Sequence, residues 1–128
     1  MKIELILLPS ADLDRSKDFY VNKVGFHLDH DVQPGNGMRI IQMTPHGSSC
    51  SIAIGTGMGT DLSCPAHNTH LVVRDIYSAR HDLLKGGVVI SDVVDMGGVK
   101  YAYFSDPDNN SWALQEIDAS AKLAHLTS

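Results

Sequence analysis

The densest set of ionisable side chains lies in the segment GFHLDHDV, where His27, Asp29 and Asp31 occupy alternate positions. Imidazole and carboxylate groups are common ligands of divalent metal ions, so this spacing could serve a metal site. Alternating charges along a strand are more typical of a face that points to solvent. We therefore expect a solvated face here. His30 shares the opposite, apolar side and could approach a ligand site.

A second candidate for chemistry is the acidic turn SDPDNN, which separates two apolar runs. Its carboxylate and amide oxygens are of the kind that bind calcium. The Asp-Pro-Asp-Asn order is also sufficient to form a tight connection between two strands, and we expect this role without calcium. The two cysteines, Cys50 and Cys64, are too few and too irregularly placed for a disulfide framework or a Cys-x-x-Cys site.

The composition is that of one compact globular domain. The 128 residues are 43% hydrophobic and 20% charged, with a formal net charge of -5 at pH 7. Lysine and arginine are scattered, so we expect no nucleic-acid partner. No apolar run approaches the roughly 20 residues of a membrane span, and the first residues do not resemble a secretory signal. The few cysteines favour a cytoplasmic protein with reduced thiols.

An internal repeat predicts the order of the elements. The segments SADLDRSKDFYVNKVGF and VRDIYSARHDLLKGGVV each run from an apolar strand through an aspartate into a helix that ends at glycine. Asp12 and Asp75 are the expected N-caps of these helices. Gly25 and Gly86 are expected to take the left-handed conformation at their C-terminal ends.

A second pair of segments agrees with the first, because each half then reads strand, helix, strand, strand, strand. The sequence therefore predicts an α+β fold of two tandem βαβββ modules, whose sheets can lie side by side around a shared cleft. We assign the modules to residues 1–57 and 66–118, within one domain of residues 1–120, and a tail to residues 119–128. The predicted strands are 2–9, 26–33, 37–44, 49–55, 68–74, 88–94, 99–105 and 112–117.

The paired modules, the D-L-x-R-S-x-x-F-Y pattern from Asp12 and the D-P-D-[GN]-N turn resemble the vicinal oxygen chelate superfamily. This group includes glyoxalase I, extradiol dioxygenases, methylmalonyl-CoA epimerase, fosfomycin-resistance thiol transferases and bleomycin-resistance proteins. The resemblance covers residues 2 to 118 and is specific for the fold. It does not decide the function, because the same scaffold carries isomerases, dioxygenases, transferases and binding proteins.

The resemblance also implies where a metal ion would bind. Catalytic members hold a divalent metal with one residue from the first and one from the last strand of each module, usually His or Glu. In this chain the matching positions hold side chains that are not expected to bind metal. They are Leu5, Ser51, Asn68 and Ala113. We therefore expect no metal and no cofactor.

Alternation along each strand predicts which side chains share the cleft side with those positions. His70 lies on one outer strand of the second module, and Tyr103 lies three residues before the acidic turn. In fosfomycin-resistance relatives a tyrosine at that place faces the substrate. We predict His70 and Tyr103 as the catalytic residues of an enzyme on this fold. The predicted ligand-binding residues are Leu5, Leu7, Gln42, Ser51, Asn68, Tyr101 and Gln115.

Two functions are compatible with these residues. The first is a metal-independent protein that binds a small organic molecule in the cleft, as bleomycin-resistance proteins do. The second is an enzyme, with a lyase, isomerase or dioxygenase-like activity that uses His70 and Tyr103 or a non-standard metal site. We favour the binding protein. The resemblance also implies a homodimer, with the modules paired within one chain or exchanged between two.

Overall fold

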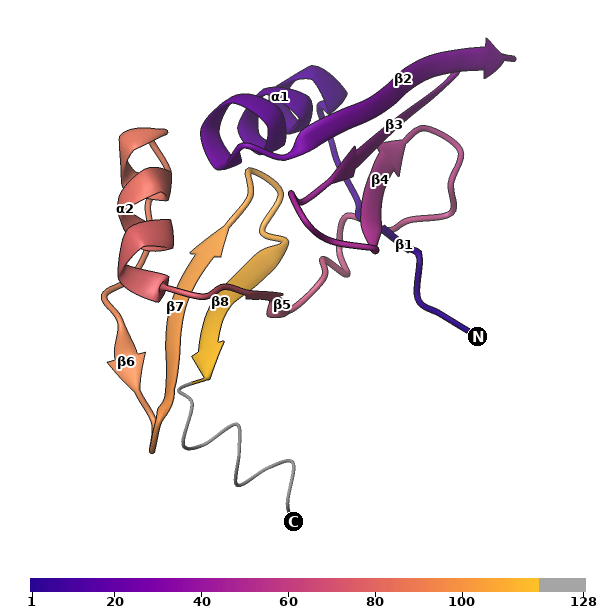
Figure 1. Cartoon of the computed structure of the whole chain (residues 1–128). Helices are drawn as coiled ribbons and strands as arrows, with labels where there is room; N and C mark the ends of the chain where they lie inside the picture. Colours follow the sequence, from indigo (N-terminus) through magenta and orange to yellow (C-terminus); the bar gives the residue numbers. More distant parts are fainter. Residues whose placement is uncertain (118–128) are drawn as a thin grey trace. The chain divides into compact units, whose positions relative to one another are not determined.

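The computed structural model describes residues 1–117, so the predicted tail, residues 119–128, lies outside the described residues. The chain divides into two compact units. The first unit comprises Met1–Ala66 and Asp106–Asn110, and the second comprises His67–Ser105 and the stretch that begins at Ser111. Each unit contains a four-stranded sheet and a helix, so the predicted α+β class and the βαβββ order are observed (Figure 1).

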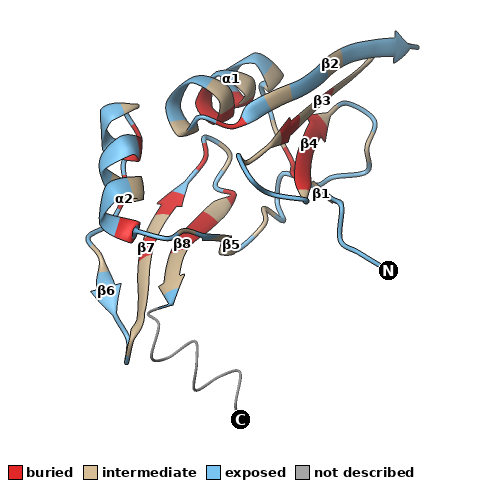
Figure 2. Cartoon of the chain, viewed as in Figure 1, coloured by how far each residue is buried: buried red, intermediate tan, exposed pale blue. Residues whose placement is uncertain are grey.

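The first unit is built on sheet A, with the strand order β1-β4-β3-β2. Its strands are β1 (Leu5–Leu7), β2 (His27–Gly35), β3 (Met38–Thr44) and β4 (Ser51–Gly55). β1 is parallel to β4, and the other neighbours are antiparallel. The helix side of the sheet forms the core of this unit, and β4 is buried along most of its length (Figure 2).

The first helix has a wide C-terminal end. Helix α1 (Leu13–Asp18) is capped by the side chain of Asp12, as predicted. It continues as a π-helical segment, η1 (Phe19–Val24), and ends at Gly25, whose φ of 94° confirms the expected left-handed residue. The carbonyl of Tyr20 accepts hydrogen bonds from the N–H groups of Gly25 and Phe26, which lie five and six residues further along the chain. Such widened turns are frequent at functional sites and here place Tyr20 in the core.

The second unit is built on sheet B, with the strand order β5-β8-β7-β6. Its strands are β5 (Thr69–Val72), β6 (Val94–Asp95), β7 (Val99–Ser105) and β8 (Ser111–Ile117). Burial alternates along the second half of β7, as expected for a strand with one face in a core (Figure 2). Trp112 and Phe104 stack in that core, with ring centroids 6.3 Å apart.

The second helix, α2 (Ile76–Lys85), begins at the predicted N-cap Asp75. The prediction that Gly86 is left-handed is wrong, because its φ is -74° and its N–H still bonds to the carbonyl of Asp82 as in a helix. The chain reverses one residue later, at Gly87, which has a φ of 92°. No helix within residues 1–117 is long and apolar enough to cross a membrane.

The sixth strand is much shorter than the predicted range 88–94. β6 contains only two residues, Val94 and Asp95. Ser91 explains part of the difference. Its N–H donates to the carbonyl of Tyr103, but the N–H of Tyr103 donates to the Ser91 hydroxyl and not to a backbone carbonyl. A side chain therefore takes the place of a ladder partner, and regular pairing starts only near the end of the segment.

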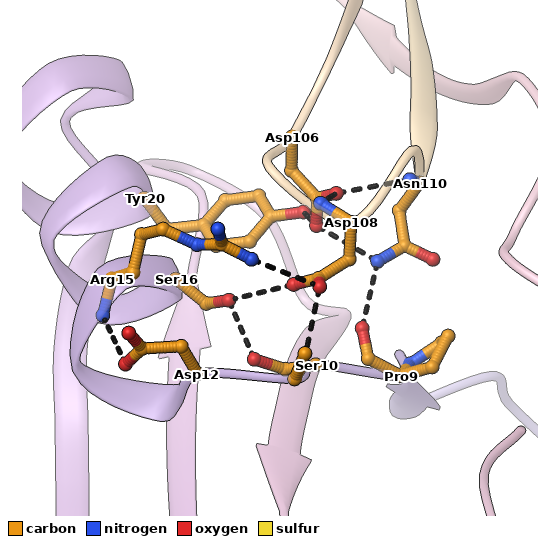
Figure 3. Close-up of polar contacts among 10 residues, drawn as sticks. Pro9, Ser10, Asp12, Arg15, Ser16, Tyr20, Asp106, Asp108 and Asn110 are labelled. Carbon is orange, nitrogen blue, oxygen red and sulfur yellow. Dashed lines mark hydrogen bonds and ion pairs between the residues drawn. The ribbon is translucent and has the colours of Figure 1, made fainter. Parts of the chain in front are cut away.

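The acidic turn between β7 and β8 belongs to the first unit, and Figure 3 shows its polar contacts. Buried Asp106 accepts hydrogen bonds from the Tyr20 hydroxyl at 2.5 Å and from the Asn110 side-chain amide at 2.8 Å. Asp108 accepts hydrogen bonds from the Ser16 hydroxyl and the Arg15 guanidinium, both at 3.2 Å. The turn is a tight connection, as predicted, and it also fixes helix α1 through contacts that are distant in sequence.

An ion cluster lies on the helix side of sheet A. The Arg39 guanidinium donates to both carboxylate oxygens of Asp31, at 2.9 and 2.7 Å, and the Lys17 ammonium donates to one of them at 2.9 Å. These hydrogen bonds, that of Arg39 first, hold the pKa of Asp31 well below its ordinary value. These partners therefore stabilise the ionised form of Asp31 in the folded state but not in the unfolded chain.

We expect Arg39→Met to destabilise the protein at pH 7 and to do so less at pH 3. The pKa of Asp31 is lowered in the folded state, so its contribution to stability is complete above the ordinary carboxyl pKa of about 4. It decreases progressively as the pH falls from that value towards the lowered pKa of the folded state. Urea unfolding at the two pH values measures the change, with Arg74→Met as an exposed control. The same difference from wild type at both pH values would contradict this account.

Candidate functional site

The face of sheet B that points away from α2 carries the predicted catalytic residues. In the strand register, Ala113 of β8 lies between His70 of β5 and Tyr103 of β7. Gln115, two residues further along β8, lies beside Tyr101 of β7. These five side chains point to the same side, because alternate residues of a strand share a face.

Three rings on this face form what we call the aromatic row: His70, Tyr101 and Tyr103. The two tyrosine rings are nearly parallel, with centroids 6.1 Å apart and an interplanar angle of 10°. The His70 ring meets Tyr101 edge to face at 5.9 Å. The Gln115 amide donates a hydrogen bond of 3.5 Å to the Tyr101 hydroxyl. Both tyrosines are half-buried and His70 is exposed, so each ring offers accessible surface.

The tautomer of His70 follows from its hydrogen bond. Its Nδ1 lies 2.7 Å from the backbone carbonyl oxygen of Asn68. A carbonyl oxygen can only accept, so Nδ1 carries the hydrogen and Nε2 of the neutral ring is left with a lone pair. Within residues 1–117 no hydrogen bond joins His70 to Tyr103, which lies on the far side of Ala113.

Asn68 does not lie in a strand, contrary to the predicted range 68–74. Its φ of 47° is left-handed, and β5 begins at the next residue, Thr69. The N–H of Asn68 donates to the Ser111 hydroxyl at 2.7 Å. Asparagine tolerates this conformation better than most residues, and period-two alternation does not reveal it.

The strand register also corrects the predicted correspondence between Leu5 of β1 and Asn68 in the second module. Leu5 lies beside Ser51 in sheet A, whereas the residue beside Ala113 in sheet B is His70 and not Asn68. Sheet A therefore offers no metal ligand at these positions, and sheet B offers one imidazole. Among residues 1–117, no three His, Cys, Asp or Glu side chains converge on one point. This donor set does not fit the metal that catalytic relatives hold.

The open face of sheet A, the face away from α1, carries the predicted ligand-binding residues of the first module. Leu5 and Leu7 on the edge strand are 46% and 43% exposed. Ser51 lies beside Leu5, and Ala53 lies between Leu7 and Gln42. The structure thus brings Leu5, Leu7, Gln42 and Ser51 together on one face.

The prediction that His27, Asp29 and Asp31 share one solvated face is wrong. The register of β2 against β3 skips one residue before His30, which is the signature of a β-bulge at Asp29. Asp31 therefore lies on the helix side with Arg39, while Asp29 and His30 both lie on the open face. Sequence alternation missed Asp29 as a site residue because a bulge breaks the period of two.

Asp29 is the centre of a polar cluster that we call the Asp29 network. The Thr44 hydroxyl donates to Oδ2 of Asp29, and the Gln42 amide nitrogen lies 3.4 Å from the same oxygen. The Ser51 hydroxyl oxygen is 2.6 Å from that of Thr44. The His27 imidazole lies 3.8 Å from Oδ1. The network therefore joins two predicted ligand-binding residues, Gln42 and Ser51, to a carboxylate.

Several solved structures resemble the chain. TnmS3, an antibiotic-binding protein from Streptomyces sp. CB03234, is 29% identical, covers 92% of this chain and 97% of its own, and has a TM-score of 0.79. A glyoxalase/bleomycin resistance protein from the same organism is 28% identical, covers 88% and 98%, and has a TM-score of 0.73. A superfamily member from Sphaerobacter thermophilus DSM 20745 is 29% identical, covers 91% and 97%, and has a TM-score of 0.77.

No protein with a curated description matches the chain. A family model does match, over residues 2–114, and it describes the glyoxalase/bleomycin resistance protein/dioxygenase superfamily. The match spans both βαβββ modules as far as the middle of β8. It agrees with the two four-stranded sheets and with the solved structures above. This chain therefore belongs to the glyoxalase/bleomycin resistance protein/dioxygenase superfamily.

Proposed function

We propose that the protein binds a small organic molecule without a metal ion, and that the aromatic row contacts this ligand. The aromatic row is the observation that carries the proposal. Two parallel tyrosine rings present apolar surface to a planar group, and their hydroxyls and the Gln115 amide supply hydrogen bonds at the edge. Apolar surface with a few fixed polar groups is typical of sites for small organic ligands.

The similarity to TnmS3 supports this proposal. That protein binds an antibiotic, and it is 29% identical to this chain over nearly the whole length of both. The fold alone would not support binding over catalysis, because one scaffold carries many functions. The similarity therefore adds weight only because the aromatic row offers a surface on which such a ligand could pack.

The chemistry of the donor set supports the metal-free part of the proposal. Leu5, Ser51 and Ala113 occupy positions where catalytic relatives hold a metal, and none of them is a ligand for zinc or iron. His70 alone offers one imidazole. One donor cannot define the geometry of a catalytic metal, which needs about three protein ligands.

His70 also favours a second candidate function. Its Nδ1–H is bound to the carbonyl of Asn68, so Nε2 is oriented and able to accept a proton. An enzyme of this superfamily could use such a base in a lyase or isomerase reaction, with Tyr103 as the acid. Tyr103 would have to act across Ala113, which separates the two residues in the sheet.

We expect His70→Ala to leave binding largely intact. The ring touches Tyr101 by one edge only, so its loss should weaken binding of 2-naphthol, a neutral planar probe, by less than about tenfold. NMR titration measures this affinity. To test for catalysis, small molecules that raise the melting temperature of the protein are incubated with it and then analysed by mass spectrometry. A binding protein should leave them unchanged. Conversion of any of them by wild type and not by His70→Ala would establish the enzyme instead.

We also propose that the protein is a homodimer and acts in the cytoplasm. Strand β1 is an edge strand of sheet A, and this supports an association of copies because the unpaired backbone of an edge strand favours contact with another chain. Sedimentation equilibrium should give twice the mass of one chain. A mass equal to one chain at all concentrations would contradict the dimer.

A further inference from the structure

We propose that Ser91 is a positioning residue of the aromatic row, and that Arg80 of α2 holds Ser91 in place. Ser91 lies on the segment that leads into β6 and acts through the backbone of Tyr103, with which it forms two hydrogen bonds. All three residues belong to the second unit. The effect on ligand affinity rests on the proposed function, whereas the effect on Tyr103 can be measured in the free protein.

Tyr103 lies where the ladder between β6 and β7 breaks off. β6 pairs Val94 with Tyr101. In the same register, Asp92 would lie opposite Tyr103. Instead, the N–H of Ser91 donates to the carbonyl oxygen of Tyr103 at 2.9 Å. Between the two contacts the segment therefore has one residue more than β7, which is the pattern of a β-bulge.

The Ser91 hydroxyl fills the gap that the additional residue leaves. A backbone N–H can only donate, so Oγ of Ser91 accepts the hydrogen bond from Tyr103 at 2.8 Å. The hydroxyl hydrogen then donates to the carbonyl oxygen of Asp92, 3.0 Å away. These two bonds join the N–H of Tyr103 to the carbonyl that would accept it directly in a regular ladder. Both backbone polar groups of Tyr103 are thus held by a single residue.

Arg80 fixes this segment against helix α2. Its Nε–H donates to the carbonyl oxygen of Ser91 at 2.7 Å. The guanidinium also lies 3.3 Å from the carboxylate of Asp92. That carboxylate is fully exposed, so the ion pair contributes little. The bond to the Ser91 carbonyl is therefore the contact through which α2 holds Ser91.

The backbone at Tyr103 determines the direction of the Tyr103 ring. On the β8 side the residue is paired with Ala113, whose methyl group offers little surface to fix a ring. The Tyr103 ring is nevertheless nearly parallel to that of Tyr101, with an interplanar angle of 10°. A β-bulge beside a site commonly re-aims a side chain in this way. Ser91 therefore supports the flat surface of the aromatic row without forming part of it.

NMR of the free protein tests the role of Ser91. Ser91→Ala should accelerate hydrogen exchange of the Tyr103 amide by about tenfold, because water replaces the hydroxyl, and should change the ring-proton shifts that Tyr103 receives from Tyr101. Ser91→Thr restores a hydroxyl and should keep the exchange rate within about twofold of wild type. Ser78→Ala, which removes an exposed serine of α2, should change neither signal. Equal exchange rates and ring shifts in wild type and Ser91→Ala would overturn the proposal.

Two further variants separate the contacts of Arg80. Arg80→Met removes the donor to the Ser91 carbonyl and should change the Tyr103 signals in the same direction as Ser91→Ala, by a smaller amount. Asp92→Ala removes only the exposed ion pair and should leave these signals unchanged. If Asp92→Ala had the larger effect, the ion pair and not the carbonyl contact would hold the segment, and the assigned role of Arg80 would be wrong.

The affinity for 2-naphthol shows whether the position of Tyr103 matters for binding. We expect Ser91→Ala to weaken binding by about three- to tenfold and Ser91→Thr to stay within about twofold of wild type. Equal affinity in wild type and Ser91→Ala would refute the positioning role and leave the proposed function standing. If 2-naphthol did not bind wild type, the proposed function would fail, and the exchange rates and ring shifts of the free variants would still decide the role of Ser91.

Discussion

Asp106→Ala should lower the free energy of unfolding by about 3–4 kcal/mol, because it removes one buried acceptor from four donors. The carboxylate accepts the Tyr20 hydroxyl, the Asn110 side-chain amide and the backbone N–H groups of Asp108 and Asn110 (Figure 3). Asp106 is only 5% exposed, so water cannot readily replace it. Urea unfolding followed by circular dichroism measures the loss.

Two further variants make the Asp106 result specific. Asp92→Ala removes a carboxylate whose side chain is fully exposed, and it should change the free energy of unfolding by less than about 0.5 kcal/mol. Tyr20→Phe deletes one of the four donors and should cost about 1–2 kcal/mol. If Asp106→Ala were no more harmful than Asp92→Ala, the acidic turn would not stabilise the first unit as we describe.

The double substitution Tyr101→Leu with Tyr103→Leu should weaken binding of 2-naphthol by roughly 10- to 100-fold. Leucine preserves apolar bulk but has no ring face, so the change removes stacking with little loss of packing. The same variant also loses the hydroxyl that receives the Gln115 amide. NMR titration gives the affinity of wild type and of the double variant for 2-naphthol, and the melting temperature shows whether the variant is folded.

Tyr77→Leu is the matched control for this pair. Tyr77 lies on α2 with 58% of its surface exposed, and its ring contacts Lys100 on the helix side of sheet B. Its substitution removes an aromatic ring of the same unit without touching the aromatic row, so affinity for 2-naphthol should stay within about twofold of wild type. An equal loss of affinity in the control and in the double variant would show that the probe does not bind on the open face.

The sequence predicted the order of elements well because that order is encoded locally. Asp12 and Asp75 cap both helices as expected, since an N-cap depends on residues within one turn of it. The shared side of His70, Tyr101, Tyr103 and Gln115 also follows from alternation in regular strands. Their role in ligand binding is a prediction that geometry alone does not test.

The parts that sequence missed depend on irregular or long-range structure. The β-bulge moves Asp29 onto the open face and Asp31 to the ion cluster, and no local pattern marks where a strand gains one residue. The left-handed Asn68 shortens β5 in the same unpredictable way. The acidic turn is predictable as a connection between strands. Its hydrogen bonds to Tyr20 and Ser16 are not, because they join residues more than 80 positions apart in the sequence.

The most direct test of metal-free ligand binding is the affinity for 2-naphthol before and after treatment with a chelator, together with the metal content of the protein by elemental analysis. We predict the same dissociation constant in both samples, amide shifts at Tyr101, Tyr103 and Gln115, and no stoichiometric metal. Loss of binding on chelation and its return with one divalent metal would contradict the account. That result would direct attention to His70 as a ligand of a non-standard metal site.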